Sequence, residues 1–321
     1  MPFQPLKLAG CSEVNVRFIR QDLIDDQGIN ALSVMDIAFV GADDLDERSQ
    51  HSVERSKKLG FQHFLVRYDP GTYTLAVGDK TFRANDGGLE DLALLFKADS
   101  IVIDATTLDF AEIALLLYAY TFSGKRPRIG FLYVEPERYV KRELEDSAVK
   151  GAEFALSEGF TTQSIPPFSG MLNPQDKVHL VAFLGFEGGR LTRAITQDDG
   201  HFMKKYSVVF GIPPFQATWD LEALMANSRL LSNQDVTVKF CGANNPKAAY
   251  DLLTETLNAT TAYSVCNRLM VSPFGTKPMA IGAALFCATE RRPRVLFDHP
   301  RRKKGRTTGV HCARWYEVDL S

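Results

Sequence analysis

Short apolar runs and amphipathic stretches alternate along almost the whole chain. The apolar runs are continuous rather than interrupted by polar residues, as in IVID at 101–104 and VHLVAFL at 178–184. Continuous runs of this kind are typical of parallel strands that are covered on both faces. Strands that alternate with helices imply right-handed crossover connections and a doubly wound sheet. The pattern therefore predicts an α/β protein with mostly parallel sheets and helices on both faces.

The same pattern predicts two successive sets of elements. For the first set we expect strands at 35–40, 63–68, 101–104 and 128–134, a hairpin at 73–83, and helices at 47–59, 88–97 and 109–122. For the second set we expect strands at 178–184, 206–210, 236–241, 268–272 and 294–298, and helices at 189–196, 218–231, 246–258 and 278–288. The last run, HCARWYEVDL, predicts a final strand.

The two sets are separated by residues 159–176, a segment that is rich in Pro, Ser, Gly and Thr and has no periodicity. This composition is typical of a connecting segment. A chain of 321 residues is also longer than one typical domain core requires. We therefore expect a first half at 1–158 and a second half at 177–321, joined by the linker 159–176.

Several segments of the first half resemble segments of the second half, in the same order. The aligned pairs are MDIAFVG at 35–41 with HLVAFLG at 179–185, IVIDATT at 101–107 with LMVSPFG at 269–275, and RPRIGF at 126–131 with RPRVLF at 292–297. The alternative explanation is that all α/β proteins alternate similar strands and helices, so that such segments resemble each other without a duplication. The repeated Arg-Pro-Arg is the detail that this alternative explains least well. The order of the pairs predicts an internal duplication that produced two tandem Rossmann-like halves.

Composition excludes several classes of protein. Hydrophobic residues make up 45% and charged residues 24% of the chain, which argues against extensive disorder. No run approaches the roughly 18 apolar residues that a membrane helix needs, and the first residues do not resemble a signal peptide. The five cysteines are scattered and form no C-x-x-C pair. We expect a cytoplasmic protein that contacts no membrane.

The loops that follow the strands are the candidate ligand sites, because doubly wound sheets bind ligands beyond the carboxyl ends of their strands. The strongest candidate is Gly275-Thr276-Lys277, in which glycine admits a ligand close to the backbone, threonine can hold an anionic oxygen, and lysine supplies charge. A plain helix start with an exposed lysine is the alternative. In the aligned loop of the first half, Thr106 and Thr107 offer hydroxyl groups beside Asp104.

A second loop contains Gly185, Gly188 and Arg190 and resembles a glycine-rich phosphate loop, although it lacks the G-x-G-x-x-G order. A tight turn alone explains it equally well. Trp219, which follows the loop after the next strand, can stack on a base or belong to the core. We find no catalytic signature and no metal-ligand spacing, so we expect neither a metal nor a cofactor. If the protein is an enzyme, Asp104 is the candidate base.

Positive charge is concentrated near the end of the chain. Residues 291–321 carry nine Lys and Arg side chains against three acidic ones, whereas the preceding residues carry a net charge of −8. The densest part contains Arg301, Arg302, Lys303, Lys304 and Arg306. Such a segment suits the phosphates of a nucleic acid or nucleotide, an acidic protein partner, or simply a solvated loop.

The segment 275–279, GTKPM, resembles a motif of the CRISPR-associated Rossmann-fold (CARF) sensor proteins, which carry Gly-Thr-Lys-x-Met after a strand. The matching residues are Gly275, Thr276, Lys277 and Met279, whereas the preceding residues 272–274 depart from the motif. The arrangement in two halves is similar to that of the SAVED domains of anti-phage systems. This resemblance implies a sensor of cyclic oligonucleotides that switches an effector, which here would be a partner chain.

Three functions remain open at this point. The first is a nucleotide- or oligonucleotide-binding regulatory or assembly subunit of a bacterial complex, such as an anti-phage system, that works with a protein partner or as a homo-oligomer. The second is an enzyme that acts on a phosphorylated or nucleotide substrate. The third is a non-catalytic structural subunit that binds nucleic acid or protein through its basic segment.

Overall fold

The structure is a computed structural model that describes residues 14–143, 152–154, 156–161, 163–197, 203–232, 235–262, 266–290 and 293–321. It contains two large sheets. In spatial order, the first sheet consists of β1 (Val16–Ile24), β19 (Cys312–Leu320), β7 (Arg128–Glu135), β6 (Ser100–Asp104), β2 (Met35–Val40), β3 (Gly60–Asp69), β4 (Thr74–Val77) and β5 (Lys80–Arg83). The second consists of β14 (Val236–Cys241), β13 (Met203–Gly211), β12 (Val178–Leu184), β15 (Arg268–Pro273) and β16 (Arg294–Val295).

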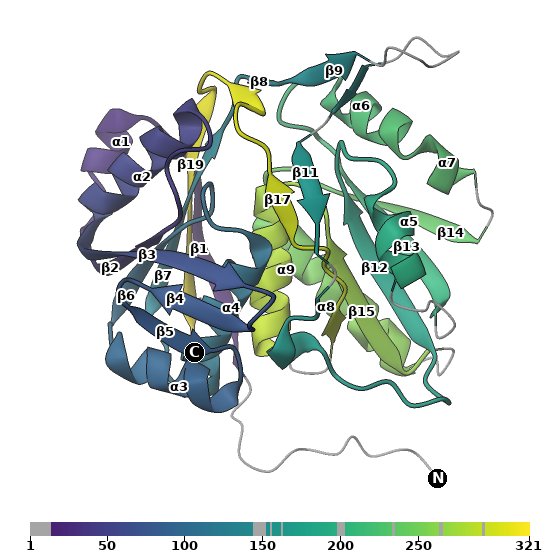
Figure 1. Ribbon diagram of the computed structural model, residues 1–321, viewed down its shortest axis with the longest axis horizontal. Helices are drawn as coiled ribbons and strands as arrows, with labels where there is room; N and C mark the ends of the chain where they lie inside the picture. Colours follow the sequence, from purple (N-terminus) through teal and green to yellow (C-terminus); the bar gives the residue numbers. More distant parts are fainter. Residues whose placement is uncertain are drawn as a thin grey trace.

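Helices cover both faces of each sheet, which confirms the predicted α/β class (Figure 1). The first half contributes α1 (Asp26–Asn30), α2 (Glu47–Leu59), α3 (Asp86–Leu95) and α4 (Phe110–Phe122). In the connecting segment, the structure describes a 3-10 turn, η1 (Pro166–Phe168). The second half contributes α5 (Arg190–Gln197), α6 (Trp219–Ala226), α7 (Ser228–Leu231), α8 (Pro246–Ala262) and α9 (Lys277–Thr289).

The predicted strands and the predicted long helices are observed, whereas strand β1, helix α1 and the short strands within residues 138–160 and 300–308 were not predicted. The predicted helix 218–231 is divided into α6 and α7 at Asn227, whose backbone leaves the helical conformation and whose side-chain amide donates to the carbonyl oxygen of Gly185. Strand β1 was not predicted, because its sequence VRFIRQDLI lies at the edge of the sheet and mixes apolar with charged residues.

The two sheets share one order of strands. Strand β2 lies between β3 and β6, with β7 beyond β6, and β12 lies between β13 and β15, with β16 beyond β15. The aligned sequence segments fall on corresponding strands, although Arg292 lies outside the described residues. Because this order is also common among unrelated doubly wound sheets, the internal duplication stays a prediction.

Helices α4 and α9 lie side by side between the two sheets and join the halves (Figure 1). Both helices are apolar on all sides and almost wholly buried, as expected for helices inside a core. The hydroxyl of Thr121 in α4 donates to the carbonyl oxygen of Ala288 in α9. Helix α8 also approaches α9 closely, because a Cβ on Gly282 would lie only 2.2 Å from the carbonyl oxygen of Pro246. One continuous apolar core therefore extends through both halves.

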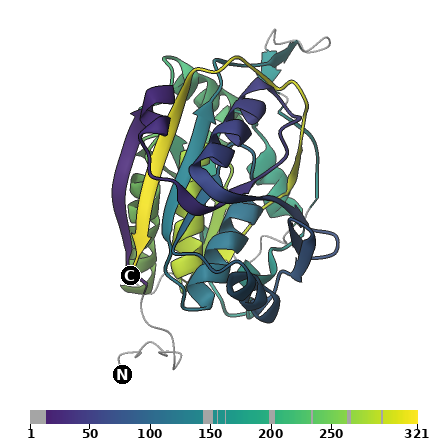
Figure 2. The same ribbon diagram turned by 90° about the vertical axis from the view of Figure 1, so that its left-hand side faces the viewer.

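The final strand departs from the predicted division of the chain. We assigned residues 177–321 to the second half, but β19 pairs antiparallel with β1 and with β7 in the first sheet (Figure 2). The physical reason is the apolar face of β19, since its Trp315 is only 1% exposed and packs over Gly130 of β7. The chain therefore leaves the second half after β16 and returns to the first.

The return passes through residues 298–309, which we call the strap. In the strap, β17 (Pro300–Arg302) pairs with β11 (Ser157–Phe160), and β18 (Thr307–Thr308) pairs with β8 (Arg138–Tyr139). Nearby, β9 (Lys141–Glu143) pairs with β10 (Ala152–Phe154). These short pairings lie between the halves, at the carboxyl ends of the parallel strands (Figure 1). None of the helices in the described part of the chain is long and apolar enough to cross a membrane.

The contact of Trp315 with Gly130 provides a test of how β19 is held. A Cβ on Gly130 would lie 2.1 Å from the Trp315 ring, so we expect Gly130→Ala to lower the free energy of unfolding by about 3 kcal/mol through overpacking. Urea denaturation would measure the change. The matched control is Gly170→Ala, because a Cβ there has open space. Equal stability of the two variants would contradict the packing described.

A buried histidine predicts the response of the fold to acid. His179 of β12 is bonded to Ser207 and Thr260, and burial, assisted by nearby lysines, lowers its pKa to about 4. In the unfolded chain the imidazole binds a proton near pH 6.5, whereas in the folded protein it does so only near pH 4. The stability that neutral His179 contributes is therefore complete above pH 6.5 and is lost as the pH falls through 4.

We therefore expect acidification from pH 6.5 to pH 4 to lower the free energy of unfolding by about 3 kcal/mol through this residue alone. In urea denaturation, the free energy of unfolding of the His179→Asn variant should depend less on pH over this range than that of the unmodified protein. The variant His63→Asn should behave like the unmodified protein, because His63 is exposed. Identical pH profiles for all three proteins would contradict the assignment.

Candidate functional site

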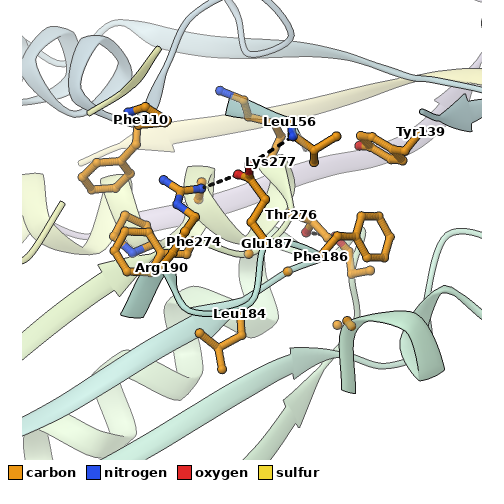
Figure 3. A pocket seen from close by; sticks show the side chains of 18 of the residues that line it. Phe110, Tyr139, Leu156, Leu184, Phe186, Glu187, Arg190, Phe274, Thr276 and Lys277 are labelled. Carbon is orange, nitrogen blue, oxygen red and sulfur yellow. Dashed lines mark hydrogen bonds and ion pairs between the residues drawn. The ribbon is translucent and has the colours of Figure 1, made fainter. Parts of the chain in front are cut away.

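A cavity of about 150 Å³ lies at the carboxyl ends of β12, β13 and β15 (Figure 3). Strand β13 lies on one side of β12 and β15 on the other, so the connections after β12 and β15 leave in opposite directions. This position is the switch point at which doubly wound sheets bind ligands. Residues 184–187 and 273–277 form part of the wall. The cavity thus lies where the sequence predicts a ligand site in the second half.

The first half and the strap complete the wall of the cavity. Asp109 and Phe110 contribute from the beginning of α4, and Arg302 and Arg306 contribute from the strap. The ammonium of Lys277 donates to the carbonyl oxygen of Leu108 at 2.5 Å and lies 3.3 Å from Asp109 Oδ1. The beginning of α4 and the loop after β15 therefore meet at one cavity, between the two halves.

Lys277 is largely buried and already engaged within the protein. Burial, together with the neighbouring Arg302, lowers its pKa to about 7, although Asp109 acts in the opposite direction. Burial alone would raise the pKa of Asp109, but Arg302 and Lys277 outweigh that effect and hold it far below its usual range. The predicted phosphate ligand Lys277 therefore binds the N-cap residue of α4 in this structure.

Thr276 and the neighbouring glycines shape the wall of the cavity. The Thr276 hydroxyl donates to the carbonyl oxygen of Ala243 at 2.5 Å and does not cap α9, which it precedes. A Cβ on Gly275 would lie 3.0 Å from Phe183 Cβ, and one on Gly185 would lie 3.0 Å from the Phe274 carbonyl oxygen. Gly188 is not among the lining residues, and a Cβ there would lie 1.9 Å from the carbonyl oxygen of Ala226. Gly188 is thus required for packing.

Arg190 begins α5 and lines the cavity close to Phe274 (Figure 3). Its guanidinium donates to both carboxylate oxygens of Asp298, at 3.0 and 2.5 Å, and lies 3.5 Å from Glu187 Oε2. Burial by itself would lower the pKa of Arg190, but the carboxylate of Asp298 raises it overall. Because Asp298 belongs to the strap, this bidentate pair attaches the strap to the second half.

The predicted residues of the first-half loop form a closed network of hydrogen bonds. Asp104 is fully buried and accepts hydrogen bonds from the hydroxyls of Ser52 and Thr107 and from the backbone N–H of Thr106. Burial raises the pKa of Asp104, against the effect of these bonds. Asp104, Thr106 and Thr107 do not line the cavity. Their predicted roles as base and ligands stay predictions, with no contact to the cavity.

The basic segment divides into side chains that point inward and side chains that point outward. Arg302 donates to the carbonyl oxygens of residues 106–108, at 3.3, 2.6 and 2.7 Å, and lies 3.2 Å from Asp109 Oδ1. Arg306 also lines the cavity. Arg301, Lys303 and Lys304 are exposed, and Lys304 is bonded to Asp44. The segment therefore does not present one continuous basic surface.

Aromatic rings form another part of the wall. The ring centroid of Tyr139 lies 5.2 Å from both Phe186 and Trp219, and the latter two centroids are 5.6 Å apart. Trp219 was a candidate from the sequence, but Tyr139 and Phe186 were missed. The only available signal was the place of Phe186 inside the glycine-rich loop. Nothing marked Tyr139, because it belongs to a two-residue strand.

No known protein family matches the chain, and no curated protein matches it. Among solved structures, it is similar to one described as CobK precorrin-6A reductase, with 11% sequence identity and a TM-score of 0.22. The similarity covers 84% of this chain and 90% of that chain. A likeness at this level says nothing about the ligand of the site. Within the described residues, no three His, Cys, Asp or Glu side chains gather as metal ligands would.

The contacts of Arg302 predict that lysine cannot replace it. Arg302→Lys retains the charge but loses the planar fork that reaches several acceptors at once, so we expect the free energy of unfolding to fall by about 2 kcal/mol. Chemical denaturation would measure this loss. Arg301→Lys is the matched control, because Arg301 lies in the same strand with its side chain exposed. If both variants were as stable as the unmodified protein, Arg302 would not hold the strap.

Proposed function

We propose that the chain is a binding module for a nucleotide or oligonucleotide, which it holds in the cavity between its two halves. The observation that carries the proposal is the composition of the cavity wall. Four cationic side chains line it, namely Lys277, Arg190, Arg302 and Arg306, and the rings of Tyr139, Phe186 and Trp219 line it as well. Cations suit phosphate groups, and flat rings suit bases of any sequence.

The position of the cavity supports the same ligand class. Doubly wound sheets hold nucleotides at the switch point, with phosphate near the beginning of a helix. Here the thirteen-residue α9 begins at the cavity, and the side chain of its N-cap residue Thr276 is turned to another acceptor. The predicted base Asp104 does not line the cavity, so the geometry favours binding over catalysis at that residue.

The regulatory part of the proposal is supported by two arginines of the cavity wall that also attach the strap to the two halves. Arg190 and Arg302 line the cavity and also attach the strap to the second and the first half, respectively. A ligand that competes for these two side chains would change both attachments. This arrangement suits a regulatory or assembly subunit whose state a nucleotide sets, as the resemblance to CARF and SAVED proteins implies.

A protein partner, or a second copy of the chain, is part of the same proposal. Strand β14 forms an edge of the second sheet and exposes Val238 and Phe240, at 40% and 56%. Exposed apolar side chains on a strand edge are typical of surfaces that another chain covers. The outward-pointing Arg301 and Lys303 leave room for nucleic acid as an additional partner.

Tryptophan fluorescence provides a direct test, because the chain has only two tryptophans. Trp315 is buried in the core, whereas Trp219 lines the cavity. We expect nucleotides that bind to quench the emission, because a base stacks on or near the Trp219 ring, and we expect the quenching to disappear in Trp219→Phe. Isothermal titration calorimetry would show whether the variant still binds.

The screen would include nucleoside monophosphates, nucleoside triphosphates and cyclic di- and oligonucleotides. If no compound produces quenching or heat, the proposed function is refuted. If a nucleotide quenches the Trp219→Phe variant as strongly as the unmodified protein, the ligand does not occupy this cavity.

A further inference from the structure

The charged side chains that line the cavity differ in whether they already have a partner. Lys277 and Arg302 share the carboxylate of Asp109. Arg190 is paired with Asp298 of the strap and lies close to Glu187. An anionic ligand at any of these three cations would have to displace, or compete with, a carboxylate of the protein itself.

Arg306 is different. Its Nε is fully buried without a hydrogen-bond partner, and among the described residues its guanidinium forms no ion pair. Burial, together with the neighbouring guanidinium groups of Arg302 and Arg48, lowers the pKa of Arg306 to about 9, although Asp46 acts in the opposite direction. It remains charged at neutral pH, and the carboxylate of Asp46 is paired with Arg48.

A buried N–H of a cationic group that has no hydrogen-bond partner is costly, and an anion that contacts it offsets that cost. Arg306 is half-buried as a whole, and it is the cation of the cavity wall that can contact an anion without displacing a carboxylate of the protein. Arg306 belongs to the strap, whereas the sequence favours the Gly275-Thr276-Lys277 loop on another part of the same cavity wall. The Lys277 ammonium and the Thr276 hydroxyl are already bonded to carbonyl oxygens of the protein.

The surroundings of Arg306 indicate what else the ligand contains. The carbonyl oxygen of Arg306 accepts from the N–H of Val140 at 2.9 Å, and Thr307 pairs with Tyr139. Arg306 is therefore adjacent to Tyr139, whose ring contacts the other two rings of the aromatic wall. An anion at Arg306 would therefore lie on the same side of the cavity as the Tyr139 ring, which suits a ligand that joins a phosphate to an aromatic base.

The size of the cavity restricts the ligand further. At about 150 Å³ it is smaller than the roughly 300–1,000 Å³ that is typical of pockets for drug-sized ligands. A single base with one phosphate group comes closest to this size, and a cyclic oligonucleotide is several times larger. The strap and β11 both contribute to the wall, so the pairing of β17 with β11 limits the space on that side of the cavity.

Given the proposed function, we infer that the site takes a nucleoside monophosphate or a similarly small aromatic phosphate ester, and that Arg306 binds its phosphate group. Lys277 and Arg302 then act mainly as structural contacts between the halves. Oligonucleotides, including the cyclic ones that the CARF and SAVED resemblance implies, should bind weakly in comparison.

The test compares AMP, GMP, CMP and UMP with their nucleosides by isothermal titration calorimetry on the full chain. For the monophosphate that binds most tightly, Arg306→Met should lower the affinity by about 30-fold, which is typical of losing a charge-assisted hydrogen bond. The affinity for the nucleoside should not change, because it carries no phosphate. Arg301→Met, which alters an exposed arginine of the strap, should leave both affinities unchanged.

Arg306→Lys is a second variant for the case in which Arg306→Met fails to fold. It retains the charge and should bind the monophosphate with intermediate affinity. If monophosphates bind but Arg306→Met and Arg306→Lys bind them as tightly as the unmodified protein, the inference is wrong and the proposed function stands. Tighter binding of a cyclic di- or oligonucleotide than of any monophosphate would refute the inferred ligand size. If nothing binds at all, the proposed function itself is refuted.

Discussion

The guanidinium of Arg302 is the contact on which the arrangement around the cavity depends. It donates to three successive carbonyl oxygens before α4 and shares Asp109 with Lys277. Without it, these carbonyl oxygens and the N-cap carboxylate would lose their main cationic partner in a largely buried interface. The strap, the beginning of α4 and the beginning of α9 are held at one point, and the cavity is the space that remains beside it.

Most of the fold could be predicted from the sequence, because its strongest signals are local. Continuous apolar runs marked the central strands, and capping residues such as Asp46 and Asn85 accompany helices whose limits were placed within two residues. Strand β1 was missed, because an edge strand has one open side and tolerates charged residues. The sheet to which β19 belongs was not predictable, because it depends on Trp315 meeting Gly130, a contact between residues far apart in the chain.

The candidate site was predictable in location but not in its contacts. The rule that ligands bind at strand ends selected the loops at 185–190 and 275–277, and both contribute to the cavity wall. The partners of their side chains depend on how α4 packs against α9, which no single loop encodes. For the same reason, the basic segment gave no indication that Arg302 would be bonded inside the protein, that Arg306 would lie beside the cavity, or that Arg301 would face solvent.

The return of the chain to the first sheet has a mechanical consequence. Many two-domain proteins open like a clamshell about a single flexible connection. In this protein the halves are connected twice, by residues 159–176 and by the strap, and β19 is anchored between β1 and β7 on both sides. A clamshell motion would have to stretch the second connection or pull a buried strand from its sheet. The two halves are therefore expected to keep their relative positions around the cavity.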